Sequence, residues 1–149
     1  MQARSSDMHA SRIGPNAITR VAEALREEFG AGGADRVFAL AGLDRYLEHP
    51  PESMVDEQEV ALLHRRLRES LGTTSARRIG REAGRRTGDY LLAHRIPKPV
   101  QWLLRRLPAA LAARVLLGAI SKHAWTFAGS GEFRVLSYRP LVLALRGNP

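Results

Sequence analysis

The sequence predicts an α+β fold, with helices over the N-terminal two-thirds of the chain and a small antiparallel sheet after them. Two observations predict this order. Apolar residues recur with the helical spacing of i, i+3, i+4 and i+7 up to about residue 124, and the spacing then changes to the alternation typical of strands. The length of 149 residues is that of one domain. We expect a single domain over residues 13–149, preceded by a disordered polar segment over residues 1–12.

The composition excludes several classes of protein. With 44% hydrophobic and 26% charged residues, the chain is typical of a globular domain and not of a disordered one. The lack of cysteine excludes disulfides, a thiol nucleophile and cysteine-ligated metal, and it fits a reducing cytoplasm. No apolar stretch reaches the length of about 20 residues that a membrane span needs. Residues 1–12 also lack the apolar core of a secretory signal.

The first part of the chain is predicted to form two helices. The first covers residues 15–29, because the missing N–H of Pro15 would have no partner at a helix start. A run of glycines from Gly30 to Gly33 ends it. The second covers residues 34–41, and the prolines after His49 stop any helix that follows. The residues expected to be buried are Ile18, Val21, Ala22, Leu25, Phe29, Val37, Phe38 and Leu40.

A third helix is predicted between Asp56 and Gly72. Asp56 is expected to cap its N-terminus together with Glu59, in an arrangement similar to a capping box. Acidic residues near its start and arginines near its end fit the helix dipole. Its buried stripe is expected to contain Val60, Leu63, Leu67 and Leu71.

A fourth helix is predicted over residues 73–95, with three parallel stripes along it. An apolar stripe lies beside a stripe of glycines, and a stripe of arginines lies beyond the glycines. Each glycine costs about 1 kcal/mol in a helix relative to alanine, so we expect another surface to approach closely and offset that cost. The stripes are Ile79, Ala83, Thr87, Tyr90 and His94, then Gly80, Gly84 and Gly88, then Arg77, Arg81 and Arg85.

Two further helices and a sheet complete the predicted fold. A helix that starts at Pro97 and Pro99 is expected to turn Val100, Leu103, Leu104 and Leu107 inward. The next helix, over residues 108–124, is apolar nearly all round and is expected to be central. Residues 125–127 and 133–136 are predicted to form a hairpin, and residues 141–145 a further strand. Because that last strand leaves a sheet edge open, we expect a homodimer that pairs across it, or poor solubility if the chain is a truncated form.

Two of the five histidines are candidates for chemistry. His94 shares the apolar stripe of the fourth helix, and His123 ends the sixth helix close to Trp125. Each is either a histidine at the edge of the core with one satisfied hydrogen bond, or a metal ligand or acid–base group. No pair has the spacing of a zinc site, so we expect no metal ion bound by the protein alone.

The arginines and glycines of the fourth helix leave alternatives open. The arginines form a solvated face, bind carboxylates in bidentate fashion, or contact nucleic acid. We expect no nucleic acid, because no helix–turn–helix or ribonucleoprotein pattern is present and aromatic residues make up only 6% of the chain. The glycines either allow tight helix–helix packing or leave a flat slot for a planar ligand such as a macrocycle.

No motif indicates a redox cofactor or a catalytic residue. The glycines of residues 30–33 follow a helix, whereas a dinucleotide fingerprint follows a strand. The sequence contains no P-loop, no nucleophile elbow and no carboxylates paired for acid–base chemistry.

Three segments resemble the bacteriochlorophyll 4-vinyl reductase family of purple phototrophic bacteria. They are residues 13–20 (IGPNAITR), 81–97 (REAGRRTGDYLLAHRIP) and 122–131 (KHAWTFAGSG). The resemblance implies a role in bacteriochlorophyll synthesis on divinyl protochlorophyllide or a related magnesium porphyrin. It also implies an α+β fold similar to those of ligand-sensor domains and of a trafficking complex, which are often dimeric. Family members continue past Pro149 with cysteines and a closing helix, so we expect this chain to lack the family's C-terminal portion.

A magnesium porphyrin is flat and apolar and carries a carboxylate, and the fourth helix offers groups for each property. We expect a histidine to reach the magnesium and an arginine to meet the propionate, with the glycines as a flat wall. The expected tetrapyrrole-binding residues are His94, His123, Arg81, Arg85, Gly84, Gly88, Tyr90 and Trp125.

Two functions remain open at this point. Because no cofactor motif is present, we expect a tetrapyrrole-binding carrier or accessory protein rather than a self-sufficient reductase. NADPH is expected only if the chain is itself a reductase. The alternative is a non-enzymatic sensor or protein-interaction scaffold. Expected partners are the magnesium porphyrin and pathway enzymes such as magnesium chelatase. The expected location is the cytoplasm or the periphery of photosynthetic membranes.

Overall fold

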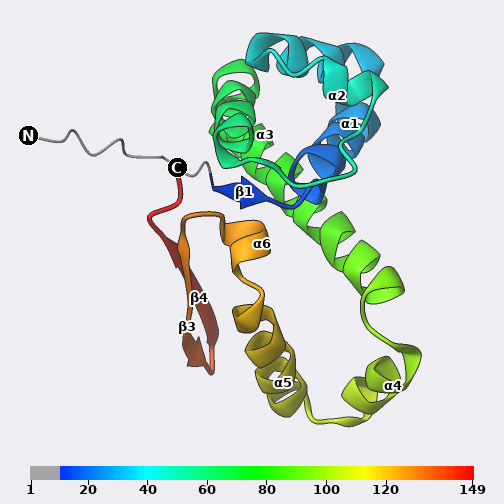
Figure 1. Cartoon of the computed structure of the whole chain (residues 1–149), viewed down its shortest axis with the longest axis vertical. Coiled ribbons are helices and arrows are strands. Elements are labelled where there is room, and N and C mark those ends of the chain that lie inside the picture. The colour runs from blue at the N-terminus through cyan, green and yellow to red at the C-terminus, as the bar shows by residue number, and fades with distance from the viewer. Residues whose placement is uncertain (1–10) are drawn as a thin grey trace, which may run out of the picture.

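The computed structural model describes residues 11–149, apart from the side chain of Trp125. Two long helices dominate it, α1 (Asn16–Ala41) and α3 (Glu57–His94), with the short α2 (Arg45–Glu48) between them in sequence. The chain continues through α4 (Lys98–Arg106), α5 (Ala109–Lys122) and α6 (Trp125–Ala128) to the strands β3 (Glu132–Tyr138) and β4 (Leu141–Arg146) (Figure 1). The predicted α+β fold, with helices first and a small antiparallel sheet after them, is confirmed.

The hydrophobic core lies where α1 packs against α3. Its largest fully buried side chains all lie on stripes that the sequence predicts, namely Ile18, Val21, Leu25, Val37, Phe38, Leu63, Leu67 and Ile79. The prediction is wrong for Leu40 and Phe29, which are 52% and 39% exposed. Leu40 lies outside the buried i, i+3, i+4 and i+7 set from Ala34 to Ala41, and Phe29 directly precedes a kink.

Glycines interrupt both long helices where the sequence predicts helix ends. Gly30 in α1 and Gly72 in α3 have φ angles of 72° and 76°, which glycine adopts without the steric cost of a side chain. Each long helix is therefore two helices joined across a kink. The Asp56 side chain caps α3 by accepting from the N–H of Gln58 at 2.8 Å. Glu59 does not complete a capping box, because it accepts a hydrogen bond from the Tyr46 hydroxyl at 2.7 Å.

A two-residue strand pair brings the start of the described chain to the start of α3. β1 (Arg12–Ile13) pairs antiparallel with β2 (Val55–Asp56). Arg12 lies in β1, so the prediction that it is disordered is wrong. A strand of two residues is too short to produce a periodic pattern in the sequence. Residues 1–10 of the predicted disordered segment lie outside the described part.

The C-terminal segment is held against this strand pair and the first turn of α3. The N–H of Gly14 donates to the carbonyl oxygen of Thr126 at 2.7 Å. The N–H of Ser130 donates to the carboxylate of Glu57, also at 2.7 Å, and Glu57 is only 8% exposed. We call Gly14, Glu57, Thr126 and Ser130 the junction. It joins the helical part of the molecule to its last elements.

The predicted strand over residues 125–127 is wrong. These residues form α6, because the N–H groups of Phe127 and Ala128 bond back to the carbonyl oxygen of Ala124. The hairpin is instead made by β3 and β4, with Glu132 opposite Arg146 and Tyr138 opposite Leu141. Residues 129–131 lead from α6 into β3.

The helix predicted over residues 108–124 is confirmed as α5, but the prediction that it is central is wrong. Leu117 is the one buried residue of α5, and Leu111 and Val115 are 49% and 55% exposed. Val100 and Leu103 of α4, predicted to point inward, are likewise exposed. An apolar helix becomes central only where other elements cover it, and β3 contacts α5 on one side. Within residues 11–149, no helix is long and apolar enough to cross a membrane.

Candidate functional site

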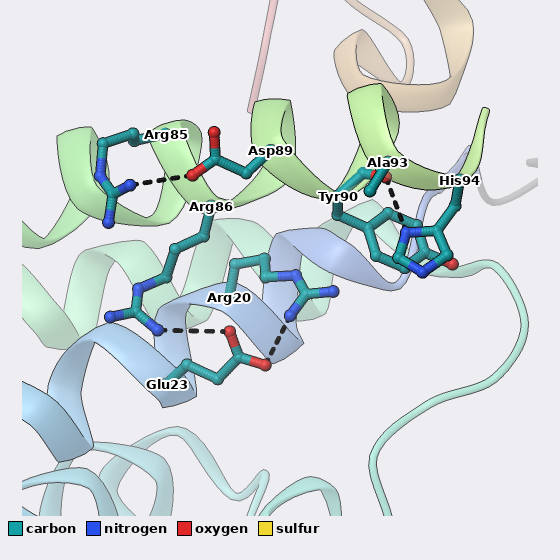
Figure 2. A pocket seen from close by; sticks show the side chains of 8 residues that line it. All are labelled: Arg20, Glu23, Arg85, Arg86, Asp89, Tyr90, Ala93 and His94. Atoms are coloured by element: carbon teal, nitrogen blue, oxygen red, sulfur yellow. Dashed lines mark hydrogen bonds and ion pairs between the residues drawn. The ribbon is translucent and has the colours of Figure 1, made fainter. Parts of the chain in front are cut away.

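A hollow of about 440 Å³ lies between α1 and the second half of α3, open to solvent (Figure 2). Helix α1 contributes Arg20 and Glu23 to its lining. The remaining lining residues come from the last turns of α3 and are Arg85, Arg86, Asp89, Tyr90, Ala93 and His94. Because α1 and α3 share the core directly beneath, the two rows of side chains are held at a fixed separation.

Tyr90 connects the two helices at one end of this hollow. The ring of His94 stacks on the Tyr90 ring, with 4.5 Å between centroids and 24° between planes. The guanidinium of Arg20 lies 4.8 Å from the Tyr90 ring centroid, a cation–π distance. Stacking across one helical turn is expected for residues at i and i+4, whereas the Arg20 contact depends on how α1 packs against α3.

His94 presents one ring nitrogen for a ligand. Its Nδ1 lies 3.0 Å from the carbonyl oxygen of Tyr90 (Figure 2). A carbonyl oxygen only accepts hydrogen bonds, so Nδ1 donates the proton and the neutral ring carries its lone pair on Nε2. Metal-binding histidines are commonly oriented in this way, by a backbone carbonyl that fixes the tautomer. His94 is exposed at the surface, so its Nε2 is accessible from solvent.

The arginines of the hollow are already paired with carboxylates. Arg85 bonds to Glu82 at 2.7 Å and to Asp89 at 2.8 Å. The hydrogen bond from Arg85 lowers the pKa of Glu82 and raises the pKa of Arg85. Arg20 pairs with Glu23 at 2.6 Å, and Arg86 pairs with Glu82 at 2.8 Å. A ligand carboxylate that enters the hollow must therefore compete with carboxylates of the protein.

The structure brings together three of the eight residues that the sequence predicts for the site. Arg85, Tyr90 and His94 line the hollow, whereas Arg81, Gly84, Gly88 and His123 do not. His123 is exposed at the end of α5, and the side chain of Trp125 lies outside the described part. Arg81 is exposed on α3, one turn before Arg85.

The glycine stripe of α3 has no surface packed against it within the described residues. Apart from its chain neighbours and the adjoining backbone of α3, a Cβ atom added at Gly80, Gly84 or Gly88 would meet no heavy atom within 4 Å in the described residues. The predicted close approach by another helix is therefore absent from the described part. Gly84 and Gly88 form an open face of α3 beside the hollow and do not line it.

Sequence reasoning missed Arg20, Glu23 and Arg86 as lining residues. Arg20 and Glu23 flank buried Val21 and Ala22, so they lie at the edge of the apolar stripe of α1. That position predicts that the two side chains lie near the boundary between α1 and another helix. The periodicity of α1 does not show which residues of the other helix they face. In residues 11–149, no three histidine or acidic side chains gather where they could hold a metal ion.

Comparison with known proteins gives two close relatives. Over 140 residues the chain is 53% identical to the bacteriochlorophyll synthase 23 kDa chain of Cereibacter sphaeroides, covering 94% of this chain and 66% of that protein. The chain is a relative of bacteriochlorophyll biosynthesis proteins. Over 138 residues it is 44% identical to the bacteriochlorophyll synthase 23 kDa chain of Rhodobacter capsulatus, covering 93% and 63% of the two proteins. It thus spans about two thirds of the length of these relatives.

No family model and no solved structure matches the chain. The two relatives support the predicted link to bacteriochlorophyll biosynthesis. Their names do not mention a vinyl reductase, so the narrower assignment to the 4-vinyl reductase family stays a prediction.

Proposed function

We propose that this chain acts in bacteriochlorophyll biosynthesis by binding a magnesium tetrapyrrole, such as divinyl protochlorophyllide, as a carrier or accessory protein. The relatives named as bacteriochlorophyll synthase chains support the pathway. The geometry of His94 supports a ligand that contains a metal ion. Its Nδ1 bonds to the Tyr90 carbonyl oxygen, and its Nε2 is accessible beside the hollow. The tetrapyrrole is cargo in this proposal and not a resident cofactor.

The chemistry of His94 suits the magnesium of such a pigment. A metal ion in the plane of a tetrapyrrole has open axial positions, and a neutral imidazole nitrogen can fill one of them. Tyr90 and Ala93 offer an aromatic ring and a methyl group next to that nitrogen, and both can contact a flat apolar macrocycle. The stacking of His94 on Tyr90 restricts the imidazole, so less conformational entropy is lost when a ligand binds.

The propionate of the pigment is proposed to meet Arg81 or Arg85. Arg81 has no carboxylate partner among the described residues, so it is available to an incoming anion. Arg85 would exchange Asp89, an exposed partner, for the propionate. A charge-assisted hydrogen bond contributes about 1.5–3 kcal/mol, so loss of the arginine that binds should weaken affinity by roughly tenfold or more.

A titration of protochlorophyllide with the purified chain tests this function, with the absorption bands and the affinity as readouts. We expect His94→Ala to shift the bands and weaken binding, because axial ligation alters the chromophore directly. His123→Ala is the matched control, since it removes an exposed histidine that does not line the hollow and should leave both readouts unchanged. Arg81→Ala or Arg85→Ala should weaken affinity with little change in the spectrum.

Three results would count against the proposal in different ways. Wild-type spectra and affinities in the His94, Arg81 and Arg85 variants would make these residues structural. A pigment that shows no band shift with micromolar wild-type protein would favour the sensor or scaffold alternative. An ethyl-group product from divinyl pigment, NADPH and this protein alone, under anaerobic conditions, would replace the carrier with a reductase.

A further inference from the structure

We propose that helix α4 docks the protein on an anionic lipid bilayer. This inference does not rest on tetrapyrrole binding, because it concerns a different part of the molecule. The docking surface, called here the α4 surface, consists of Lys98, Val100, Trp102, Leu103, Arg105 and Arg106. In Figure 1, α4 lies at the end of the long axis opposite α1 and α2.

The apolar side chains of the α4 surface are about half exposed. None of the nine residues of α4 is buried. Val100, Trp102 and Leu103 are 42%, 55% and 53% exposed, a large apolar area for one short helix. Exposed apolar patches that are rimmed by polar groups mark sites of protein or membrane interaction.

The charged side chains of α4 and its neighbours in the sequence are all positive. From Tyr90 to Gly131 the sequence contains no aspartate or glutamate, yet it contains six lysines and arginines. Within the described residues, Lys98, Arg105 and Arg106 make no ion pair. By contrast, seven arginines elsewhere are paired with carboxylates, and these are Arg20, Arg45, Arg66, Arg78, Arg85, Arg86 and Arg134. The exposed apolar side chains of α4 therefore lie beside three cations that have no carboxylate partner in the described part of the chain.

The combination of residue types favours a bilayer over an acidic protein. Helices that lie in a membrane interface combine tryptophan and leucine with lysine and arginine, and anionic headgroups attract the cations. The guanidinium of Arg106 lies 3.7 Å from the Trp102 ring centroid, so a cation and an amphipathic aromatic ring occupy one site. At nine residues α4 is too short to cross a bilayer, but it can lie along one.

The attachment of α4 to α3 gives this surface a defined orientation. The side-chain amide of Gln101 donates to the carbonyl oxygens of Leu92 and Ile96, at 2.6 and 2.8 Å. These bonds hold the Gln101 side of α4 against the end of α3. Trp102 and Leu103 are the more exposed residues that follow Gln101, and they remain available to lipid.

Vesicle sedimentation tests the proposal directly. The full chain is mixed with vesicles of phosphatidylglycerol and phosphatidylcholine in equal parts, or of phosphatidylcholine alone. We expect binding to the anionic vesicles that falls steeply as salt is added, and little binding to the neutral ones. In a Trp125→Phe variant Trp102 is the remaining tryptophan, and its emission should shift to shorter wavelength when anionic vesicles are added.

Paired variants separate the α4 surface from the general positive charge. Arg105→Glu with Arg106→Glu should weaken vesicle binding by at least about tenfold, because each cation near the surface contributes to attraction. Arg65→Glu with Arg68→Glu changes the net charge equally on exposed positions of α3 and should leave most binding intact. Leu103→Ser should weaken binding, whereas Leu40→Ser, at a similar exposure of 52%, should not.

Equal loss in the α4 and α3 charge variants would overturn the proposal, and so would equal binding to both kinds of vesicle. Sedimentation or pull-down with polyglutamate but not with anionic vesicles would assign the surface to an acidic protein and would also overturn it. Tetrapyrrole binding is measured separately without lipid, so failure of either proposal leaves the other testable.

Discussion

His64 on α3 is a titratable side chain whose surroundings oppose its charged form. Burial lowers the pKa of His64, and the positive charge of Arg68 lowers it further. In the unfolded chain the imidazole regains an ordinary pKa of about 6.5. Between the folded and unfolded pKa values the unfolded state binds more protons, so the free energy of unfolding rises with pH across that window.

We predict that His64→Gln flattens this pH dependence. The wild-type protein should lose stability as the pH falls below about 6.5, with a slope of at most about 1.4 kcal/mol per pH unit from this residue. Urea unfolding at pH 7.5 and pH 5 measures the difference. His49→Gln, at an exposed loop position, should keep the wild-type dependence. A slope that is the same in both variants would show that His64 does not cause it.

The part of the candidate site that lies on α3 was predictable from the sequence. Tyr90 and His94 share a stripe, and their stacking follows from the i, i+4 spacing alone. Arg20 was not predictable, because its contact with Tyr90 depends on the angle at which α1 crosses α3. The pairing of Arg85 with Glu82 and Asp89 could have been expected from the i, i+3 and i, i+4 spacings, but the alternatives considered for this arginine were a solvated face, a ligand carboxylate and nucleic acid.

At the scale of elements, α3 contains two kinds of glycine. Gly72 has φ 76° and ψ 163°, a region essentially restricted to glycine, and it forms the kink. Gly84 lies in regular helix, where an added Cβ meets no described atom within 4 Å. The same substitution at the two positions should therefore change stability in opposite directions.

We predict that Gly72→Ala destabilises the protein by about 1–3 kcal/mol, because alanine cannot adopt the kinked backbone without strain. Gly84→Ala should stabilise it by up to about 1 kcal/mol, since alanine is the better helix former and space is open. The midpoints of urea denaturation measure both changes. If Gly84→Ala is destabilising instead, a surface outside the described residues must pack on the glycine stripe.

The helices near the core were predictable from sequence, and so were the positions of α4 and α5 along the chain, but the burial of α4 and α5 was not. Helix ends at Gly30 and Gly72 follow from glycine itself, and the buried stripes follow from the period. For α5, an apolar composition predicts burial only if a covering element exists, and composition does not provide that information. Residues 125–127 read as a strand because Trp, Thr and Phe favour strands, but local turn hydrogen bonds decide their helical conformation.

At the scale of the whole molecule, apolar exposure is concentrated in the second half. Strand β4 is exposed along much of its length, with Leu141, Leu143 and Leu145 at 50%, 44% and 43%. In the described residues β4 pairs with β3 alone, so one of its edges has unpaired backbone groups. Open apolar edges pair readily with another chain.

We predict a homodimer that forms across this edge of β4. Light scattering at high protein concentration should give twice the monomer mass, and Leu143→Lys should return the protein to a monomer, because a charge on an edge strand opposes pairing. Leu40→Lys places the same charge on an exposed position of α1 and should leave the mass unchanged. A wild-type protein that stays monomeric at high concentration would contradict the prediction.

The junction has a consequence for the order in which the chain folds. Gly14 bonds to Thr126 and closes a loop over most of the chain, and Glu57 bonds to Ser130 and closes a loop over about half of it. The entropy lost on closing a loop grows with its length, whereas the α1–α3 core closes over the shorter segment that contains α2. We therefore expect α1 and α3 to pack together early in folding. The hydrogen bond from the N–H of Ser130 to the buried carboxylate of Glu57 should form in the last step.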